Sequence, residues 1–470
     1  MTSLDQNGLT SDLTIIGTGM AGMAAAIFAA NRKIKTLLIG NTGAGNFASG
    51  MFDLLGAYPL ETRQMRIDPW AGIDALISEN PKHPYARIKT RSLMAAIDEL
   101  LAYLKHAGLD YCIDGKLNST VITPAGTTRL SYAIPASMQN GVKALKDKKA
   151  CLLVDFHGMK EYSALQIVSV LQKKWPALKA ASVTFPGYEN ISEVFTESMA
   201  RALEVPETGK ALAMTIKPLL GNAKSVGMPA VFGLYKTRHI FKELEKAIGV
   251  PLFEIPTMPP SVPGLRLMET VKSDLPARGI TTFFQNRVTT AEQTADGNFS
   301  LAFTAATGAQ KIKTKAVILA TGRFLGKGLY ADRHNIREAL FDLPVAQPDA
   351  RDQWHQKDFL DPRGHRINTA GVEIDADFRP LDSSGQVAFP NLFAVGTILA
   401  HQDWMRTKCG SGLSIASAYA AVNAFLKNSC PIIQEKTGVG NQQSTKWRIK
   451  NDPIYRGNRP GYHEQSFHHF

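Results

Sequence analysis

Three glycines near the start of the chain have the spacing of a nucleotide-phosphate site. They are Gly17, Gly19 and Gly22, within IIGTGMAG at Ile15–Gly22. The first glycine permits a tight turn, the second lets the backbone approach a phosphate, and the third lets a helix pack close to a strand. A helix that starts there also presents unpaired N–H groups and its positive dipole end. The same spacing closes ordinary strand-to-helix turns, so the surrounding elements decide between the two interpretations.

A second group of glycines lies near the other end of the chain, at Gly396 and in CGSG at Cys409–Gly412. It precedes a stretch of small residues typical of a packed helix. A helix that points its N-terminus at a flavin ring stabilises the negative charge that the ring gains on reduction. A loop that only turns the chain is the alternative. The combination with IIGTGMAG and with LATG at Leu319–Gly322 favours the flavin. The cofactor-binding candidates from these motifs are Gly17, Gly19, Gly22, Thr321, Gly322, Gly396, Gly410, Ser411 and Gly412.

Cys409 beside this turn has two interpretations. It is either a redox thiol with a lowered pKa at a helix start or a small buried residue. The remaining cysteines are Cys112, Cys151 and Cys430, and the chain contains no CxxC pair. We therefore expect neither a disulfide framework nor a protein-ligated iron–sulfur cluster, and the cysteine usage is typical of a reducing, cytoplasmic compartment.

Basic residues gather in GRFLGKGLYADRHNIREAL at Gly322–Leu340. The cations are Arg323, Lys327, Arg333 and Arg337, with His334 among them. Guanidinium groups match phosphate and carboxylate geometry, so an anion site is one interpretation. The other is a solvated face or ion pairs with Asp332 and Glu338. A histidine close to a flavin would suit proton acceptance in alcohol oxidation. The candidate catalytic residues are His334, Arg337 and Arg266.

Two more segments have the character of loops. PTMPPSVPGLRL at Pro256–Leu267 is too Pro-rich for a helix, and we expect a rigid loop with Arg266 at its end. ITPAGTTRLSY at Ile122–Tyr132 has the same character and carries Arg129. Both segments could line a pocket, and both could be ordinary connections.

The elements that must position these groups follow from apolar patterns. Asp12–Gly17 is predicted as a strand, Met20–Asn31 as an Ala-rich helix and Lys35–Ile39 as a strand, which together start a βαβ unit. Ala316–Gly322 and Pro390–Gly396 are two further buried strands that end in glycine turns. These strands lie far apart in the chain and end alike, so they predict one sheet assembled from distant segments.

The middle of the chain has a different pattern. It alternates strand-like and helix-like pieces, such as Cys151–Phe156 and Ala164–Lys173. We expect an α/β fold in which a Rossmann-like flavin-binding domain is interrupted by an inserted cap or substrate domain. The predicted parts are residues 1–108 (flavin-binding domain, first part), 109–266 (inserted cap or substrate domain), 267–427 (flavin-binding domain, second part) and 428–470 (basic C-terminal tail).

Bulk properties set further limits. The chain has 470 residues and a formal net charge of +12, and it is too long for one simple core. No apolar run reaches the ~18 residues of a membrane-spanning helix, and Met1–Leu13 does not resemble a secretory signal. Lys436–Phe470 contains six Lys or Arg against two Asp or Glu. This tail is either a solvated extension or a docking segment for a partner or an anionic membrane face. We expect no nucleic-acid partner.

The second strand ends without an acidic residue. In a dinucleotide site an Asp or Glu at this strand end binds the adenosine ribose. Here the strand ends in Ile39, Gly40 and Asn41, and the next carboxylate is Asp53. This absence favours FMN, which has no adenosine, over FAD. The amide oxygen of Asn41 can still accept a hydrogen bond from a ribose hydroxyl, so Asn41 is a cofactor-binding candidate and FAD remains the alternative.

Longer stretches are specific enough to indicate a family. They are IIGTGMAG, FASGMFDLLG (Phe47–Gly56), HPY (His83–Tyr85), TPAGTTR (Thr123–Arg129), PTMPPSVPGLRL, LATGRFLGKGL with ADRHNIRE, and NLFAVGTIL with CGSG. With these stretches the chain resembles the B subunits of anaerobic glycerol-3-phosphate dehydrogenase, within the fumarate-reductase-like flavoproteins. The resemblance covers roughly residues 12–427. FASGMFDLLG and PTMPPSVPGLRL are its most specific phrases, and Ser49 and Gly50 of the first join the cofactor-binding candidates.

The resemblance implies a flavoprotein that takes part in oxidising glycerol 3-phosphate, a small anionic substrate, to dihydroxyacetone phosphate, with electrons leaving towards quinone. It implies two partners, an FAD-bearing A-type subunit and an iron–sulfur C-type subunit associated with the membrane, and it assigns FMN to the B-type subunit. The chain would then be cytoplasmic and peripheral on the inner face of the cell membrane.

The resemblance leaves open whether this subunit oxidises the substrate or relays electrons. One alternative is a stand-alone fumarate-reductase-like oxidoreductase that acts on another small anion. The other is a non-catalytic assembly subunit. The tail from about Asn428 departs from the family pattern.

Overall fold

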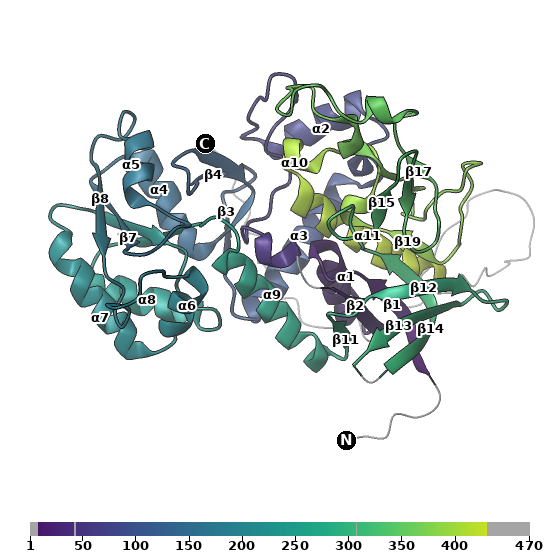
Figure 1. Ribbon diagram of the computed structural model, residues 1–470, viewed down its shortest axis with the longest axis horizontal. Helices are drawn as coiled ribbons and strands as arrows, with labels where there is room; N and C mark the ends of the chain where they lie inside the picture. The colour runs from purple at the N-terminus through teal and green to yellow at the C-terminus, as the bar shows by residue number, and fades with distance from the viewer. Residues whose placement is uncertain (1–7, 42–43, 307, 430–470) are drawn as a thin grey trace, which may run out of the picture. The chain divides into compact units, whose positions relative to one another are not determined.

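A seven-stranded sheet carries the glycine turns. The computed structural model describes residues 8–41, 44–306 and 308–429. The sheet order is β11-β2-β1-β14-β13-β12, and β19 pairs with β14 (Figure 1). Strands β11, β2, β1, β14 and β19 are parallel to one another, whereas β13 is antiparallel to both of its neighbours, β14 and β12. Their bounds are β1 Leu9–Ile16, β2 Thr36–Gly40, β11 Thr281–Phe284, β12 Val288–Gln293, β13 Phe299–Ala305, β14 Gly308–Leu319 and β19 Leu392–Ala394. The prediction of one sheet assembled from distant segments is confirmed.

Three helices pack together beside this sheet. They are α1 (Met20–Asn31), α3 (Thr90–His106) and α11 (Gly410–Ser429). Helix α1 is buried along most of its length, and its alanines keep it narrow enough to lie close to its neighbours. At its end Arg32 forms an ion pair with Glu99 of α3. These contacts fix α1 against α3 and α11.

A second sheet lies wholly within the middle of the chain. Its order is β10-β9-β7-β8, and all its pairs are parallel. The strands are β7 Cys151–Phe156, β8 Leu178–Val183, β9 Ser225–Pro229 and β10 Leu252–Ile255; the helices between them are α5 Ala164–Leu171, α6 Thr196–Ala202, α7 Pro206–Ile216 and α8 Thr237–Ile248, and α4 Gln139–Asp147 precedes them. This sheet has hydrophobic cores of its own. The borders at residues 109 and 266 stay predictions.

The Pro-rich stretch contains the start of a helix, which corrects the sequence prediction. Residues 256–261 form a loop as expected, but α9 runs over Val262–Asp274. Pro263 stands in the first turn, where no backbone N–H is needed for the helix ladder, so proline is tolerated there. A second correction concerns ITPAGTTRLSY, since β4 (Ser119–Ile122) and β5 (Thr128–Ser131) pair as a hairpin.

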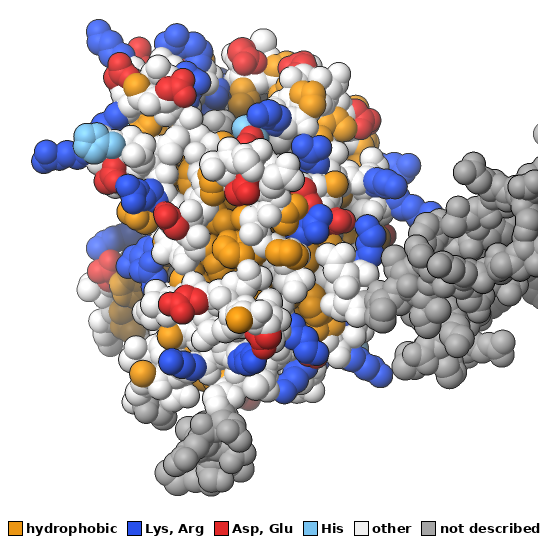
Figure 2. All heavy atoms as spheres, turned by 90° about the vertical axis from the view of Figure 1, so that its right-hand side faces the viewer, with side chains coloured by type: hydrophobic (Ala, Val, Ile, Leu, Met, Phe, Trp, Pro, Cys, Tyr) orange, Lys and Arg blue, Asp and Glu red, His pale blue; other side chains and the backbone are white. Residues whose placement is uncertain are grey.

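The remaining α-helices and strands of the described residues lie outside the two sheets. They are α2 Pro69–Glu79, α10 Trp404–Thr407, and the antiparallel pairs β3 Tyr111–Ile113 with β6 Ala133–Pro135, β15 Leu329–Ala331 with β16 Ile336–Glu338, and β17 Val345–Ala346 with β18 Gly371–Val372. On the face shown in Figure 2, apolar side chains gather at the centre among scattered Lys and Arg. The predicted basic tail, residues 430–470, lies outside the described residues, so its role stays a prediction.

Candidate functional site

The turn between β1 and α1 is closed by backbone packing. Gly17 has a φ of +119°, and its N–H donates to Ile39 O at 2.7 Å. A Cβ on Gly17 would lie 2.2 Å from Ala320 O, and one on Gly22 would lie 1.7 Å from Gly17 O. Nothing lies within 4 Å of a Cβ position on Gly19. The turn is therefore tight at its two ends and open at Gly19, which is the form that a phosphate turn requires.

The other glycine motifs lie at the same edge of the sheet. Ala320 N donates to Ile16 O at 2.8 Å, so Thr321 and Gly322 follow β14 next to the turn. A Cβ on Gly396 would lie 2.7 Å from the Cβ of Ala21 in α1. Segments that are hundreds of residues apart thus meet at the carboxyl ends of parallel strands, where open α/β sheets bind ligands.

Two buried hydroxyls at this edge indicate what the site can take. Thr18 Oγ1 and Thr321 Oγ1 are inaccessible to solvent and have no hydrogen-bond partner among the residues that the structure describes. A buried hydroxyl without a partner costs free energy. Phosphate oxygens are hydrogen-bond acceptors of the kind that these two donors lack, and the open space at Gly19 leaves room for a phosphate. The residues present therefore fit a flavin nucleotide.

The strand end that lacks an acid lies beside this turn. A Cβ on Gly40 would lie 2.7 Å from Thr18 N, so β2 ends in close contact with the glycine turn. Asn41 follows and is exposed. No hydrogen bond of its side chain is found in residues 8–41, 44–306 and 308–429. The ribose contact expected of Asn41 stays a prediction.

The start of α11 is bound to FASGMFDLLG. Asp53 N donates to Ser411 Oγ at 2.7 Å, and Gly412 N donates to Asp53 O at 2.9 Å. A Cβ on Gly412 would lie 2.7 Å from Asp53 O, so this position needs glycine. The N–H of Gly412 is therefore already satisfied inside the protein, and the flavin contact expected of Gly410, Ser411 and Gly412 stays a prediction.

Three other stretches that carry the family resemblance also contact FASGMFDLLG. Tyr85 of HPY donates its hydroxyl to Leu54 O at 2.9 Å. Gly50 packs so closely on Pro263 that a Cβ would lie 2.5 Å from the proline Cβ. Arg129 of TPAGTTR forms an ion pair with Asp53. For Ser49 the described residues provide no side-chain hydrogen bond, and its role stays a prediction.

The three candidate catalytic residues have other surroundings. His334 is exposed in the turn between β15 and β16, where its backbone N–H donates to Asp332 Oδ1 at 2.6 Å. Arg337 is half exposed and lies 3.9 Å from Asp332 Oδ2, which agrees with the ion-pair interpretation. Arg266 is 3% exposed and forms two hydrogen bonds with Glu254, at 2.7 and 2.6 Å. Within the described residues no hydrogen bond or ion pair joins any of them to the glycine edge.

The pair Arg266–Glu254 belongs to the interior. Burial opposes the charge on Glu254, but Arg266, Ser137 and the N–H of Phe232 together hold its pKa below the usual range. Arg266 Nε donates to Gly233 O at 2.6 Å. Each of the three guanidinium nitrogens of Arg266 thus donates to an acceptor inside the protein, and the group is not available to a substrate.

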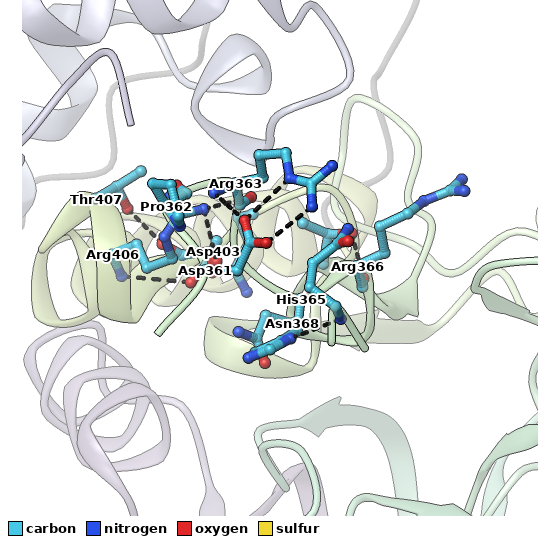
Figure 3. A network of polar contacts seen from close by, with 12 residues as sticks. Asp361, Pro362, Arg363, His365, Arg366, Asn368, Asp403, Arg406 and Thr407 are labelled. Atoms are coloured by element: carbon cyan, nitrogen blue, oxygen red, sulfur yellow. Dashed lines mark hydrogen bonds and ion pairs between the residues drawn. The ribbon is translucent and has the colours of Figure 1, made fainter. Parts of the chain in front are cut away.

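The cations of the basic stretch after LATG differ in exposure: Arg323 is engaged within the protein, and Lys327 is exposed to solvent. Arg323 donates to Leu399 O and Gln402 O, at 3.2 and 2.8 Å, and also to Asn368 O. Burial lowers its pKa to about 10. A polar network holds the segment that supplies Asn368 O (Figure 3): Arg406 of α10 donates to Arg363 O at 2.8 Å. Arg323 thus fixes loops at the edge, whereas Lys327 faces outward.

Cys409 agrees with its structural interpretation. It is fully buried, and burial raises the pKa of its thiol to about 12. Sequence reasoning missed the pair of Asp53 and Arg129, although it noted each residue separately. The two lie 76 positions apart, so no local spacing connects them.

Known proteins with similar sequences match almost the whole of the described chain. The family model described as "FAD binding domain" matches residues 12–413. The B subunit of an anaerobic glycerol-3-phosphate dehydrogenase from Vibrio vulnificus (strain YJ016) is 29% identical over 88% of this chain and 96% of its own length. A probable B subunit of the same enzyme from Halobacterium salinarum (strain ATCC 29341 / DSM 671 / R1) is 30% identical over 88% of this chain and 98% of its own.

A solved structure, 3-ketosteroid delta1-dehydrogenase from Sterolibacterium denitrificans, is similar with a TM-score of 0.40 and 10% identity, covering 89% of this chain and 100% of that chain. Among the helices of the described residues, none has the length and apolar character needed to span a membrane.

Proposed function

Because the chain belongs to the FAD binding domain family and to the B subunits of anaerobic glycerol-3-phosphate dehydrogenase, we propose that it takes part in oxidising glycerol 3-phosphate to dihydroxyacetone phosphate and passes the electrons towards quinone. It is a flavin-dependent oxidoreductase subunit. A bound flavin supplies a two-electron acceptor for the oxidation of a secondary alcohol. What this chain supplies is the site that holds and orients that group.

One observation carries the proposal: the glycine edge of the main sheet. Thr18 and Thr321 bring unpartnered hydroxyls to it, among the residues that the structure describes, and Gly19 leaves room for a phosphate. Phe47–Gly56, one of the two most family-specific stretches, is tied to the first turn of α11 through Asp53. The relatives named as dehydrogenase components match this chain along 88% of its length, which supports the same activity for it.

For the finer identity of the flavin we propose FAD. The FAD binding domain model matches from residue 12 to residue 413, and thus includes most of β1, all of β14 and β19, and the start of α11. FMN, which the missing acid after Ile39 favours, stays the competing prediction. The mass of the flavin released from the purified protein separates them, because FAD contains an adenosine monophosphate that FMN lacks.

The proposed partners are an FAD-bearing A-type subunit and an iron–sulfur C-type subunit, with the complex peripheral on the inner face of the cell membrane. The relatives are themselves named as one lettered component of their dehydrogenase, which supports a complex of several subunits. Electrons from this subunit then need a path through the partners, so activity with a quinone is expected of the complex and not of this chain alone.

The test is anaerobic reduction of the bound flavin by glycerol 3-phosphate, followed by absorbance, for the chain alone and with co-expressed partner subunits. Reduction of this subunit's flavin at a rate that supports turnover of the complex agrees with the proposal. Reduction by a different organic acid alone would instead favour a stand-alone oxidoreductase. A chain that binds no flavin in the active complex would be an assembly subunit, and the proposal would fail.

A further inference from the structure

Asp53 is held in place by its backbone. Its N–H donates to Ser411 Oγ at 2.7 Å, and its carbonyl accepts from Gly412 N at 2.9 Å. The neighbouring Gly56 N donates to Thr407 O at 3.0 Å. The segment is thus fixed at Asp53 to the first turn of α11 and at Gly56 to the chain that leads into this helix. Its carboxylate has a defined position at the start of a 20-residue helix.

The carboxylate of Asp53 is only partly satisfied. Its Oδ2 accepts from Arg129, but its Oδ1 is buried and has no partner in the part of the chain that the structure describes. The side chain is 14% exposed. Burial raises the pKa of Asp53, and the positive charges of Arg129 and Lys408 act against this. The negative charge of Asp53 is therefore stabilised by the cations beside it, Arg129 and Lys408.

Arg129 has unused hydrogen-bonding capacity. A guanidinium carries five N–H donors, and the residues described here give this one a single side-chain acceptor, Asp53. Its side chain is 31% exposed, about twice as much as that of Asp53. By contrast, Arg266 donates to Gly233 O and to both carboxylate oxygens of Glu254, and Arg323 donates to three backbone carbonyl oxygens. Arg323 retains a buried Nε without a partner among the described residues, but both of its terminal nitrogens are engaged, whereas Nη1 of Arg129 has no acceptor in the part of the chain that the structure describes and is open to a ligand.

A second cation lies near this pair. Lys408 is exposed and has a φ of +54°. It packs on Gly56, since a Cβ on Gly56 would lie 2.8 Å from the Cβ of Lys408. Its charge acts on the carboxylate of Asp53. Two cations and one internal carboxylate thus share one place, which leaves a net positive charge beside the first turn of α11.

We propose that Arg129 is the anion-binding residue of this subunit, with Lys408 as its second cation, and that Asp53 is an internal counterion that a small phosphate monoester displaces from Arg129. A guanidinium pairs with phosphate through two parallel N–H···O bonds, which the carboxylate contact leaves available. The displaced Asp53 then has two free oxygens, which accept from hydroxyl groups of the same ligand. A polyol phosphate satisfies both halves of the site. The choice of ligand rests on the proposed function.

The test measures binding and needs no turnover. Titration calorimetry on the purified, flavin-loaded protein uses inorganic phosphate and glycerol 3-phosphate, with glycerol as the uncharged comparison. Arg129→Gln is expected to weaken binding of both anions by about tenfold to a hundredfold, since a charged hydrogen bond contributes roughly 1.5–3 kcal/mol. Asp53→Asn is expected to tighten phosphate binding by about threefold or more, because the internal competitor has lost its charge. Glycerol binding is expected to be undetectable throughout.

The opposite signs separate this role from a structural ion pair. If the pair only stabilised the fold, Asp53→Asn and Arg129→Gln would weaken anion binding together, and that result would overturn the proposal, as would unchanged phosphate binding in Arg129→Gln. Arg278→Gln is the matched control, because Arg278 and Asp274 form a pair of similar exposure, 28% and 29%; its anion binding is expected to stay unchanged.

Two further measurements keep the outcome decisive. Arg129→Lys retains the positive charge and is expected to keep more phosphate affinity than Arg129→Gln, even if the latter unfolds at a lower temperature. Flavin reduction by glycerol 3-phosphate is recorded separately. Phosphate binding at Arg129 without such reduction would contradict the proposed function alone. Reduction with an unchanged KM in Arg129→Gln would contradict this inference alone.

Discussion

At the scale of single residues, Gly19 and Gly22 differ in what surrounds them although they belong to one turn. A Cβ on Gly22 would lie 1.7 Å from Gly17 O, and a Cβ on Gly19 would have nothing within 4 Å. Gly22→Ala is therefore expected to distort the turn and lower the unfolding temperature. Gly19→Ala is expected to leave that temperature unchanged but to weaken flavin binding by about tenfold or more, because its methyl group takes the place of a phosphate.

Thermal unfolding and the flavin dissociation constant check this prediction. Gly209→Ala in α7 is a matched control, since the nearest atom to its Cβ position lies 3.8 Å away and the residue is helical. It is expected to keep flavin binding and to gain slightly in stability. Wild-type flavin affinity in Gly19→Ala would refute the phosphate role of this turn.

At the scale of elements, the start of α11 depends on a contact from outside the helix. Ser411 Oγ accepts from Asp53 N at 2.7 Å. Ser411→Ala leaves this N–H without its acceptor and is expected to lower the free energy of unfolding by about 1 kcal/mol. Ser429→Ala is the control, because Ser429 lies at the other end of α11 and its hydroxyl donates to Phe425 O of the same helix. Urea denaturation of both variants measures the difference, and equal losses would argue against the tie between Asp53 and α11.

The elements also show what a sequence can reveal. Helix α1 spans Met20–Asn31 as predicted, because its Ala-rich pattern and the glycines before it are local signals. Helix α9 differs, because its prolines are typical of a loop unless their place in the first turn is known. The glycine edge could be predicted, since each strand ends in its own glycine motif. The pair of Asp53 and Arg129 could not, because only the folded chain brings the two residues together.

At the scale of the whole described chain, one buried ion pair links α9 to the second sheet. Arg266 of α9 is paired with Glu254 of β10, and their side chains are 3% and 0% exposed. Glu254→Gln leaves the arginine charge buried without its counterion and is expected to lower the free energy of unfolding by about 3–5 kcal/mol. Glu197→Gln, which breaks the exposed pair with Arg201, is expected to cost about 0.5 kcal/mol or less.

The cost of Glu254→Gln is also expected to depend on pH. The pKa of Glu254 lies below its usual range in the folded protein. The stability that its charge provides is therefore complete above the pKa of an unfolded glutamate, about 4.3, and is lost as pH falls through the lower folded value. Urea denaturation across a pH series should give a constant difference between wild type and variant from neutral pH to about pH 5, and a smaller one below about pH 4. A difference that grows on acidification would contradict the charged pair.

The order of strands in the main sheet has a consequence for synthesis on the ribosome. The second sheet is finished at Ile255, since its four strands follow one another between Cys151 and that residue. The main sheet begins earlier, with β1 at Leu9, yet β1 gains its neighbour β14 only when residue 319 has emerged, and β19 joins after residue 394. The sheet that begins first is therefore completed after the second sheet. Until β14 has emerged, the edge of β1 that pairs with it is unpaired. Exposed apolar strand edges of this kind promote aggregation of nascent chains and recruit chaperones.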